Sequence, residues 1–258
     1  MLDLDVQVLT LAASLAVMVA TWVISLAAKD ASLADISWGL CFVAIAWTAF
    51  AVGPDAGDRS LLIAALITLW GCRLAAYIAI RHDGEDRRYQ AMRRKQGSAF
   101  AVRSLVTVFV LQAAVAWVVS VPVQVAATDA TPESLGVLAI IGALICLIGL
   151  ACEATADFQL ARFLRDPGSS GQVMDRGIWR YSRHPNYFGD AFFWWGVFLI
   201  ALETGSAWWT AIGPIVMTTF LLKVSGVALT EKTISSRRPG YAEYVERTSA
   251  FIPLPPKK

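Results

Sequence analysis

Ionisable side chains lie inside segments that are otherwise apolar. Glu153 and Asp157 are four residues apart, so a helix would place both carboxylates on one face. Asp35, Arg73 and Lys223 lie in three other apolar segments. An ionisable group at membrane depth is costly and therefore indicates function, although Arg73 and Lys223 also fit snorkelling or a structural ion pair. The spacing of the two acids predicts a polar pocket among apolar helices.

A stripe of polar residues follows the same helical spacing. Arg183, Asn186, Tyr187 and Asp190 occur at i, i+3, i+4 and i+7, in a segment that continues as Phe-Phe-Trp-Trp-Gly. Guanidinium, amide, phenol and carboxyl groups on one helix face can bind the polar part of a ligand. We therefore expect this face to line the pocket.

Two more apolar segments carry polar and aromatic residues on one face. Asp35 and Trp38 are three residues apart, and Trp70, Arg73 and Tyr77 share a face of another helix. We expect these faces to turn inward as well. The pocket would then open toward the arginine-rich loops.

The composition is that of a membrane protein. Of the 258 residues, 57% are hydrophobic and only 16% are charged, and the mean hydropathy is +0.56. Soluble domains carry about 25% charged residues, so this chain has too few charges to coat a soluble surface. A soluble enzyme, a disordered chain and a disulfide scaffold are excluded, which leaves an all-α polytopic membrane protein. No metal site is predicted, because the chain has two histidines and its cysteines lie in apolar runs without a CxxC pair: Cys41, Cys72, Cys146 and Cys152.

We predict seven transmembrane helices, because a spanning helix needs about 20 mostly apolar residues. The loops after the third and fifth spans and the C-terminal tail are rich in arginine and lysine, whereas the opposite loops contain one basic residue, Arg59. Basic loops mark the cytoplasmic side, so the N-terminus is expected outside and the C-terminus in the cytoplasm. Residues 239–247 of the tail are expected to form a short helix on the cytoplasmic face. The predicted spans cover about 6–28, 33–52, 60–80, 104–127, 134–160, 185–202 and 205–231.

The loop at 162–183 combines five arginines with three glycines. Guanidinium groups match phosphate oxygens, so a phosphorylated cofactor from the cytoplasm is one explanation, and positive-inside charge alone is the other. Nucleic acid is not expected as a partner, because the basic residues lie in short loops without a separate domain. The chain has no GxGxxG after a strand, no Walker A sequence, no GxSxG and no HExxH. A dinucleotide would therefore have to bind outside a Rossmann fold.

The segment Gly177-Ile-Trp-Arg-Tyr-Ser-Arg-His-Pro-Asn-Tyr-Phe-Gly-Asp190 resembles the C-terminal region of the membrane steroid 5α-reductase family. It is also similar to the Arg-His-x-Asn-Tyr-x-Gly-Asp pattern of the sterol reductases. The similarity covers about 150–253, and the first half is more weakly similar to the bacterial branch of the same family. The other matching motifs are Glu153-xxx-Asp157, Tyr241-xx-Tyr244, Phe251-Ile-Pro253, Ala34-Asp35-Ile-Ser-Trp-Gly39 and Trp70-Gly-Cys-Arg73.

The resemblance implies a seven-helix membrane oxidoreductase that uses NADPH and forms a single membrane domain over 1–258. It implies substrate-side helices at about 1–100 and a cofactor-binding region at about 134–258. The implied substrate is a 3-oxo-Δ4 steroid or a similar lipid-soluble enone that enters from the bilayer. The implied location is the bacterial inner membrane, with the cofactor site facing the cytoplasm. The implied cofactor contacts are Glu153, Asp157, Arg162, Arg165, Tyr181, Arg183, His184, Asn186, Tyr187, Asp190, Glu231 and Tyr244.

The first half departs from the family pattern at the substrate site. The family has a Gln-Glu pair on the second span and a Tyr on the third, whereas the matching positions here are Ala34-Asp35 and Trp70. Tyr77 and Tyr89 are the alternative phenolic donors. The implied catalytic residues are Asp35, Trp38, Trp70, Arg73, Tyr77 and Tyr89.

The implied chemistry needs a hydrogen-bond donor at the substrate's carbonyl. Hydride transfer to the β-carbon of an enone develops negative charge on the carbonyl oxygen, which a donor stabilises. Burial would favour a protonated Asp35 as that donor, whereas a nearby Arg73 would favour its anion. The sequence is compatible with both the protonated and the anionic form of Asp35.

Two other functions also fit the sequence. Integral methyltransferases of the isoprenylcysteine carboxyl type bind S-adenosylmethionine and share an Arg-His-Pro-x-Tyr pattern, a later Glu pair and a Tyr-xx-Tyr ending. Here the later site reads Leu229-Thr-Glu231-Lys232, with one Glu instead of two. A non-enzymatic lipid-binding or transport protein is the third interpretation, which the lack of inverted repeats disfavours. The sequence makes no prediction of the oligomeric state.

Overall fold

The computed structural model describes residues 3–129, 131–224, 226–227, 231, 238 and 240–257. All regular structure in these ranges is helical, in agreement with the all-α prediction. The chain divides into two compact units. Unit 1 consists of Met1–Ile140 and Phe198–Gly213, and unit 2 consists of Ile141–Val197 and Pro214–Lys258.

Five helical segments of the described residues are long and apolar enough to cross a membrane. They correspond to the first five predicted spans and indicate an integral membrane protein. The helix Pro185–Leu202 has the bounds of the sixth predicted span. The described part of the seventh is a shorter apolar helix, Trp208–Val224, while residues 225 and 228–230 of that prediction lie outside the described residues. The five segments are Leu4–Ala28, Leu33–Val52, Asp58–Arg81, Arg87–Val119 and Val137–Arg165.

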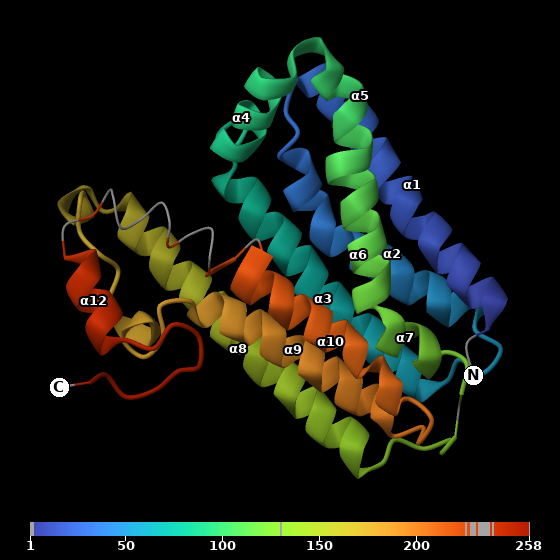
Figure 1. The fold of residues 1–258 in the computed structure, drawn as a ribbon. Helices are drawn as coiled ribbons and strands as arrows, with labels where there is room; N and C mark the ends of the chain where they lie inside the picture. Colours follow the sequence, from blue (N-terminus) through green and yellow to red (C-terminus); the bar gives the residue numbers. More distant parts are fainter. Residues whose placement is uncertain are drawn as a thin grey trace. The chain divides into compact units, whose positions relative to one another are not determined.

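Unit 1 is a group of helices packed side by side (Figure 1). The second helix contacts both the first and the third, and the first also contacts the helix that begins at Leu111. The elements are α1 (Leu4–Ala28), α2 (Leu33–Val52), α3 (Asp58–Arg81), α4 (Arg87–Gln96), α5 (Phe100–Ser104), α6 (Leu111–Val119) and α7 (Val121–Ala126).

Helix α1 turns its small polar side chains inward and most of its large apolar side chains outward. Thr10 and Ser14 are fully buried, whereas Val23 and Ile24 are 56% and 59% exposed. The Thr10 hydroxyl donates to the carbonyl oxygen of Val6 over 2.6 Å, so burial leaves it satisfied. An apolar exterior over a small polar interior is the arrangement expected of a helix that faces lipid.

Helices α2 and α3 approach each other closely at a pair of glycines. A Cβ atom on Gly39 would lie 2.5 Å from the carbonyl oxygen of Gly71. Because no side chain fits there, the two backbones can pack directly against each other. This contact fixes the position of Asp35, which lies one turn before Gly39 on α2.

The fourth predicted span differs from the observed helix. The sequence predicts a span at 104–127 preceded by a basic loop, whereas the structure has one helical segment of 33 residues, Arg87–Val119. The basic loop is itself helical as α4, because the Asp86 side chain caps its first turn by accepting a hydrogen bond from the Arg88 backbone N–H. A π-helical stretch at Leu105–Val110 then joins α5 to α6.

Unit 2 contains most of α8 (Val137–Arg165), α9 (Pro185–Leu202) and α10 (Ile212–Thr219). A Cβ atom on Gly189 would lie 2.6 Å from the carbonyl oxygen of Gly149, so this glycine pair brings α8 and α9 together. The connection between these helices holds the short 3₁₀ helices η3 (Pro167–Ser169) and η4 (Gly177–Arg180). The tail forms α12 (Tyr241–Arg247), at the position of the predicted tail helix.

Candidate functional site

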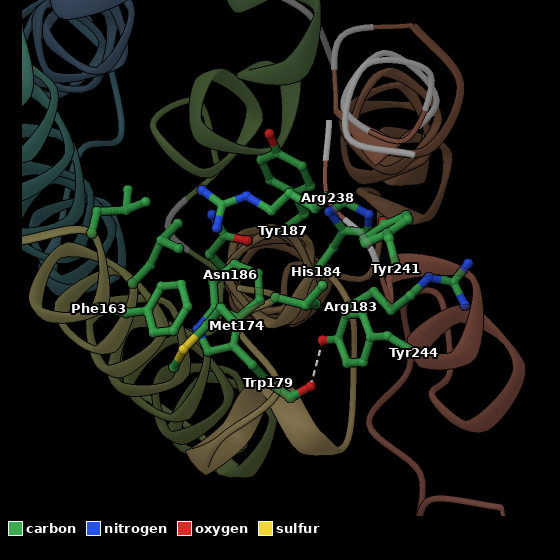
Figure 2. Close-up of a pocket in the computed structure, with 13 residues that line it drawn as sticks. Phe163, Met174, Trp179, Arg183, His184, Asn186, Tyr187, Arg238, Tyr241 and Tyr244 are labelled. Carbon is green, nitrogen blue, oxygen red and sulfur yellow. Dashed lines mark hydrogen bonds between the residues drawn. The ribbon is translucent and has the colours of Figure 1, made fainter. Parts of the chain in front are cut away.

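Unit 2 encloses a cavity of about 320 Å³. Figure 2 shows side chains from α8, η4, α9 and α12 converging on it. Aromatic walls with a few polar groups are typical of small-molecule sites. The cavity is lined by Leu160, Phe163, Leu164, Val173, Met174, Trp179, Arg183, His184, Asn186, Tyr187, Arg238, Tyr241 and Tyr244.

Asn186 brings an unsatisfied acceptor to the cavity. Its Nδ2 donates to Oδ1 of Asp157 over 3.3 Å, which orients the amide, because a carboxylate can only accept. The Oδ1 of Asn186 is buried and has no hydrogen-bond partner in the described part of the chain. Buried polar atoms are normally hydrogen-bonded, so this oxygen fits a donor group on a ligand.

Arg183 and His184 both contact Glu231. The Nε of Arg183 donates to Oε1 of Glu231 over 2.9 Å, and the Nε2 of His184 lies 3.2 Å from the same oxygen. The His184 ring is parallel to that of Tyr187, with centroids 5.5 Å apart. Burial lowers the pKa of His184, and the Glu231 carboxylate offsets only part of this effect, so a neutral imidazole is favoured at neutral pH.

Helix α12 and the η4 turn contribute Tyr244 and Trp179 to the cavity wall. The Tyr244 hydroxyl donates to the carbonyl oxygen of Trp179 over 2.5 Å, and the Trp179 indole N–H donates to that of Ala156 over 3.0 Å. The Ser182 hydroxyl donates to the carbonyl oxygen of Phe251 over 2.8 Å. Burial raises the pKa of Tyr244, so its phenol remains a donor. These bonds bring residues distant in sequence to one wall.

The residues predicted to bind a cofactor fall into three groups in the structure. Those that line the cavity are Arg183, His184, Asn186, Tyr187 and Tyr244. Those that bond directly to a lining residue are Asp157 and Glu231. The others do not line it: Glu153 and Asp190 are buried in α8 and α9, and Arg162, Arg165 and Tyr181 are exposed.

Five lining residues with aromatic, thioether or cationic side chains were not assigned from the sequence: Phe163, Met174, Trp179, Arg238 and Tyr241. Trp179 and Tyr241 lie inside the motifs that carry the family resemblance, so the motifs themselves could have indicated them. No spacing rule links Met174 and Arg238 to the rest of the cavity.

A second polar site surrounds Asp35 in unit 1. The Nη2 of Arg88 donates to one carboxylate oxygen over 2.9 Å, and the Tyr89 hydroxyl donates to the other over 2.7 Å. Arg88 and Tyr89 are neighbours on α4, whereas Asp35 is on α2. The Asp35 side chain is 26% exposed. A carboxylate, a guanidinium and a phenol therefore form one hydrogen-bonded group.

Gln112 on α6 extends this group. Its Nε2 donates to the Tyr89 oxygen over 3.4 Å. The phenol gives its only proton to Asp35, so it can accept but not donate a further bond, and the amide must turn its NH₂ toward it. Sequence reasoning missed both Gln112 and Arg88. A single amide in an otherwise apolar helix was the available signal for Gln112.

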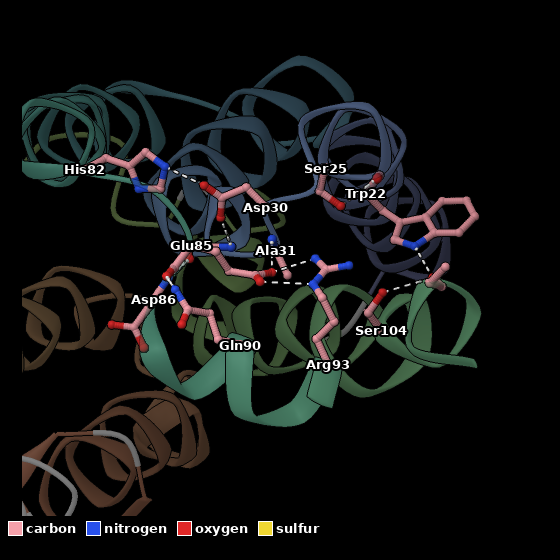
Figure 3. Close-up of polar contacts among 12 residues, drawn as sticks. Trp22, Ser25, Asp30, Ala31, His82, Glu85, Asp86, Gln90, Arg93 and Ser104 are labelled. Atoms are coloured by element: carbon pink, nitrogen blue, oxygen red, sulfur yellow. Dashed lines mark hydrogen bonds and ion pairs between the residues drawn. The ribbon is translucent and has the colours of Figure 1, made fainter. Parts of the chain in front are cut away.

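Two loops of unit 1 hold the start of α4 in place (Figure 3). The Nε2 of His82 lies 2.7 Å from Oδ2 of Asp30. Arg93 donates to both carboxylate oxygens of Glu85, over 2.6 and 3.0 Å, and the Ala31 backbone N–H donates to Glu85 over 3.0 Å. The hydrogen bond from Arg93 lowers the pKa of Glu85. These contacts tie the α1–α2 turn to the α3–α4 loop and so set where α4 presents its site residues.

Aromatic side chains follow Asp35 along α2. The Trp38 ring packs edge-on against Phe42, with centroids 5.0 Å apart. The Phe42 ring packs edge-on against Trp70 on α3, with centroids 5.4 Å apart. Trp70 is completely buried. The aromatic positions predicted on α2 and α3 are thus connected through Phe42.

Arg73 and Tyr77 form a separate contact on α3. The Arg73 guanidinium carbon lies 5.5 Å from the centroid of the Tyr77 ring, and that of Arg81 lies 5.0 Å from it. The sequence suggests Arg73 as the cation near Asp35. In the structure, Arg88 is the arginine that pairs with this carboxylate.

The chain matches the profile of the family described as Protein of unknown function (DUF1295) over residues 21–248. The match covers most of the chain, so the chain belongs to this family. A comparison with curated proteins and with solved structures finds no match.

Proposed function

We propose that this protein is an NADPH-dependent reductase of a lipid-soluble conjugated enone, such as a 3-oxo-Δ4 steroid. The observation that carries the proposal is the unit 2 cavity, whose walls include residues of the motifs that resemble the steroid 5α-reductase family. Its aromatic rings, cations and unsatisfied amide oxygen suit a nucleotide better than they suit a lipid.

The cavity residues fit a nicotinamide nucleotide. Asn186 Oδ1 is buried without a partner and could accept a hydrogen bond from a carboxamide or an exocyclic amine. Tyr187 and Tyr241 offer ring faces for stacking. Arg183 and Arg238 offer guanidinium groups for phosphate oxygens. When bound, NADPH supplies the hydride.

The Asp35 site in unit 1 supplies the proton in this proposal. Tyr89 donates its phenolic proton to the carbonyl oxygen of the enone as negative charge develops there, and the Asp35 carboxylate then relays a proton from solvent to the Tyr89 phenolate. The hydrogen bond of 2.7 Å between Asp35 and Tyr89 supports this transfer. Asp35 takes this proton from solvent, to which its side chain is partly exposed. The resulting enol tautomerises to the saturated ketone, so the reaction consumes one hydride and one proton.

The proposal includes the finer topology. The protein spans a bacterial inner membrane seven times, with α9 and the segment at 205–231 as the sixth and seventh spans. The N-terminus is outside and the C-terminus is cytoplasmic. The arginines of the 162–183 loop, the α4 helix and the tail support this orientation, because basic segments mark the cytoplasmic side. The substrate enters from the bilayer and the nucleotide enters from the cytoplasm.

The test is a ligand-dependent thermal shift of the full chain in detergent. A ligand that binds only the folded protein raises the melting temperature, by an amount that grows with its concentration over Kd. NADPH should raise it and S-adenosylmethionine should not. Consumption of NADPH at 340 nm with progesterone or testosterone then tests turnover.

Each alternative function has its own outcome in this experiment. A shift with S-adenosylmethionine alone would replace the proposal with a membrane methyltransferase. If the folded protein responds to neither ligand, it is not a reductase, and the non-enzymatic lipid-binding interpretation takes its place.

A further inference from the structure

A second cavity, of about 280 Å³, lies in the C-terminal segment of unit 2. Its walls come from the end of α12, from the chain that follows it, and from Arg183. The proposed reaction uses none of these residues except Arg183. The lining consists of Arg183, Val245, Arg247, Thr248, Ser249, Ala250, Leu254, Pro255 and Lys257.

The lining is cationic, with three basic side chains, two hydroxyls and no acid. Arg183 pairs with Glu231, and Arg247 pairs with Asp175, both of which lie outside the lining. The ion pairs of the described residues do not include Lys257. Its backbone N–H donates to the Arg247 carbonyl oxygen over 2.9 Å, which holds the two basic residues together. Guanidinium, ammonium and hydroxyl donors around one cavity match the oxygens of a phosphate.

Apolar side chains flank these cations on the surface. Leu254 and Val245 line the cavity and are 53% and 38% exposed, and Ile252 nearby is 58% exposed. Cations beside exposed aliphatic side chains are typical of a segment at the membrane interface, where acyl chains cover the aliphatic groups and headgroups meet the charges.

Backbone hydrogen bonds place this segment at the end of an apolar helix. The Arg183 N–H donates to the carbonyl oxygen of Ser249 over 2.8 Å, and the Leu254 N–H donates to that of Tyr181 over 2.9 Å. Tyr181 and Arg183 directly precede α9, which begins at Pro185. The cavity therefore lies beside the point where α9 begins, which is where a headgroup would be found if α9 spans the bilayer.

We propose that this cavity binds the phosphate of an anionic glycerophospholipid headgroup, with the acyl chains against Leu254 and Val245. A free phosphate would gain nothing from the exposed aliphatic side chains, so the lipid is the ligand that uses both halves of the surface. This site shares Arg183 with the nucleotide cavity, and its other lining residues have no part in the reductase proposal.

The test measures lipid binding by the full chain in dodecyl maltoside. Dioctanoyl phosphatidylglycerol, dioctanoyl phosphatidylcholine and inorganic phosphate are each titrated, and the melting temperature is recorded. Phosphatidylglycerol should raise it at the lowest concentration. Each cation near an anionic headgroup contributes about 1 kcal/mol, so Lys257→Gln should weaken the apparent affinity about fivefold and Arg247→Gln with Lys257→Gln about 25-fold. The effect should also shrink as salt is raised.

The matched control is Lys95→Gln, an exposed lysine in the last turn of α4. It removes the same charge and should leave phosphatidylglycerol binding unchanged. If the double variant folds poorly because it lacks the Arg247–Asp175 pair, the single variant Lys257→Gln still tests the proposal. The proposal is overturned by equal binding of phosphatidylglycerol to the wild type and to Lys257→Gln, or by equal weakening in Lys95→Gln. It is also overturned if inorganic phosphate binds as tightly, or if no lipid binds.

Discussion

The Asp35 site in unit 1 and the cavity in unit 2 satisfy their polar groups in different ways. Both oxygens of the Asp35 carboxylate are bonded by the chain itself, to Arg88 and Tyr89. In the cavity, the Oδ1 of Asn186 is buried without a partner in an aromatic space of about 320 Å³. Since buried polar atoms are normally paired, the cavity is prepared for a ligand, whereas the Asp35 carboxylate is already bonded at both oxygens and must exchange a bond to act. Changes in unit 1 should therefore affect turnover, and changes in unit 2 should affect nucleotide binding.

Tyr89→Phe should produce the largest effect. It removes the proposed donor to the carbonyl oxygen and keeps the ring, so kcat for enone reduction should fall about 10²- to 10³-fold. NADPH affinity should stay within twofold of the wild type. NADPH oxidation and the thermal shift with NADPH measure the two quantities.

Tyr77→Phe is the matched comparison for Tyr89→Phe, because the sequence alone allowed either phenol. Tyr89 is the tyrosine whose hydroxyl donates to Asp35, whereas the contacts of Tyr77 include the guanidinium groups of Arg73 and Arg81. Loss of the Tyr77 hydroxyl should leave kcat nearly unchanged. If Tyr77→Phe is the slower variant, the proposed donor is wrong.

Asp35→Asn should reduce kcat by about 10²-fold, at the low end of general acid–base catalysis, because Tyr89 can still donate once before it must be reprotonated. Its affinity for NADPH should remain that of the wild type, since the change lies in unit 1. Asp83→Asn, at an exposed aspartate of the α3–α4 loop, removes a charge of the same kind and should be neutral. A kcat in Asp35→Asn equal to the wild-type value would exclude Asp35 from the reaction.

Asn186→Ala tests the cavity. It removes both the bond to Asp157 and the acceptor for the ligand, which is worth about 1–1.5 kcal/mol, so the Kd for NADPH should rise about tenfold. At saturating NADPH, kcat should change little. Thr155→Ala, at an exposed position of α8, serves as control. An unchanged Kd in Asn186→Ala would contradict the assignment of this cavity to the nucleotide.

His184→Gln should give the smallest effect, on the pH dependence of stability. Because burial lowers the pKa of His184, the unfolded chain takes up this proton before the folded protein does. The contribution of His184 is therefore complete above about pH 6.5 and is lost as the pH falls below that value. The wild type should lose about 2 °C more than His184→Gln between pH 7.5 and pH 5.5, in melting curves without ligand. Identical slopes in the two proteins would show that His184 does not titrate in this range.

The apolar helices could be predicted from the sequence because their signal is local. The predicted spans at 33–52 and 185–202 coincide with α2 and α9. Long apolar runs bounded by charge or proline leave few alternatives for the backbone in a bilayer. The basic stretch before α5 gave no such signal, since helix formation by α4 depends on a cap at Asp86 and on contacts from other loops.

The sequence predicted only some of the residues that form the two sites. Helical spacing grouped Arg183, Asn186 and Tyr187, because residues on one face of a helix stay together whatever surrounds them. The arginines at 162 and 165 belong to the same predicted loop but point to solvent, outside the cavity lining. Nothing in the spacing distinguishes an arginine that lines a cavity from one that only marks the cytoplasmic side.

The order of residues along the chain is enough to predict that this protein is helical, that its helices suit a lipid bilayer, and which helix faces carry chemistry. These properties depend on the type and spacing of residues within one element. Packing between elements sets which residues distant in sequence meet: Arg88 and Tyr89 at Asp35, and Trp179 with Tyr244 in the cavity wall. These contacts depend on glycine pairs at which helices pack closely and on loop contacts between residues distant in sequence. Neither leaves a periodic pattern in the sequence.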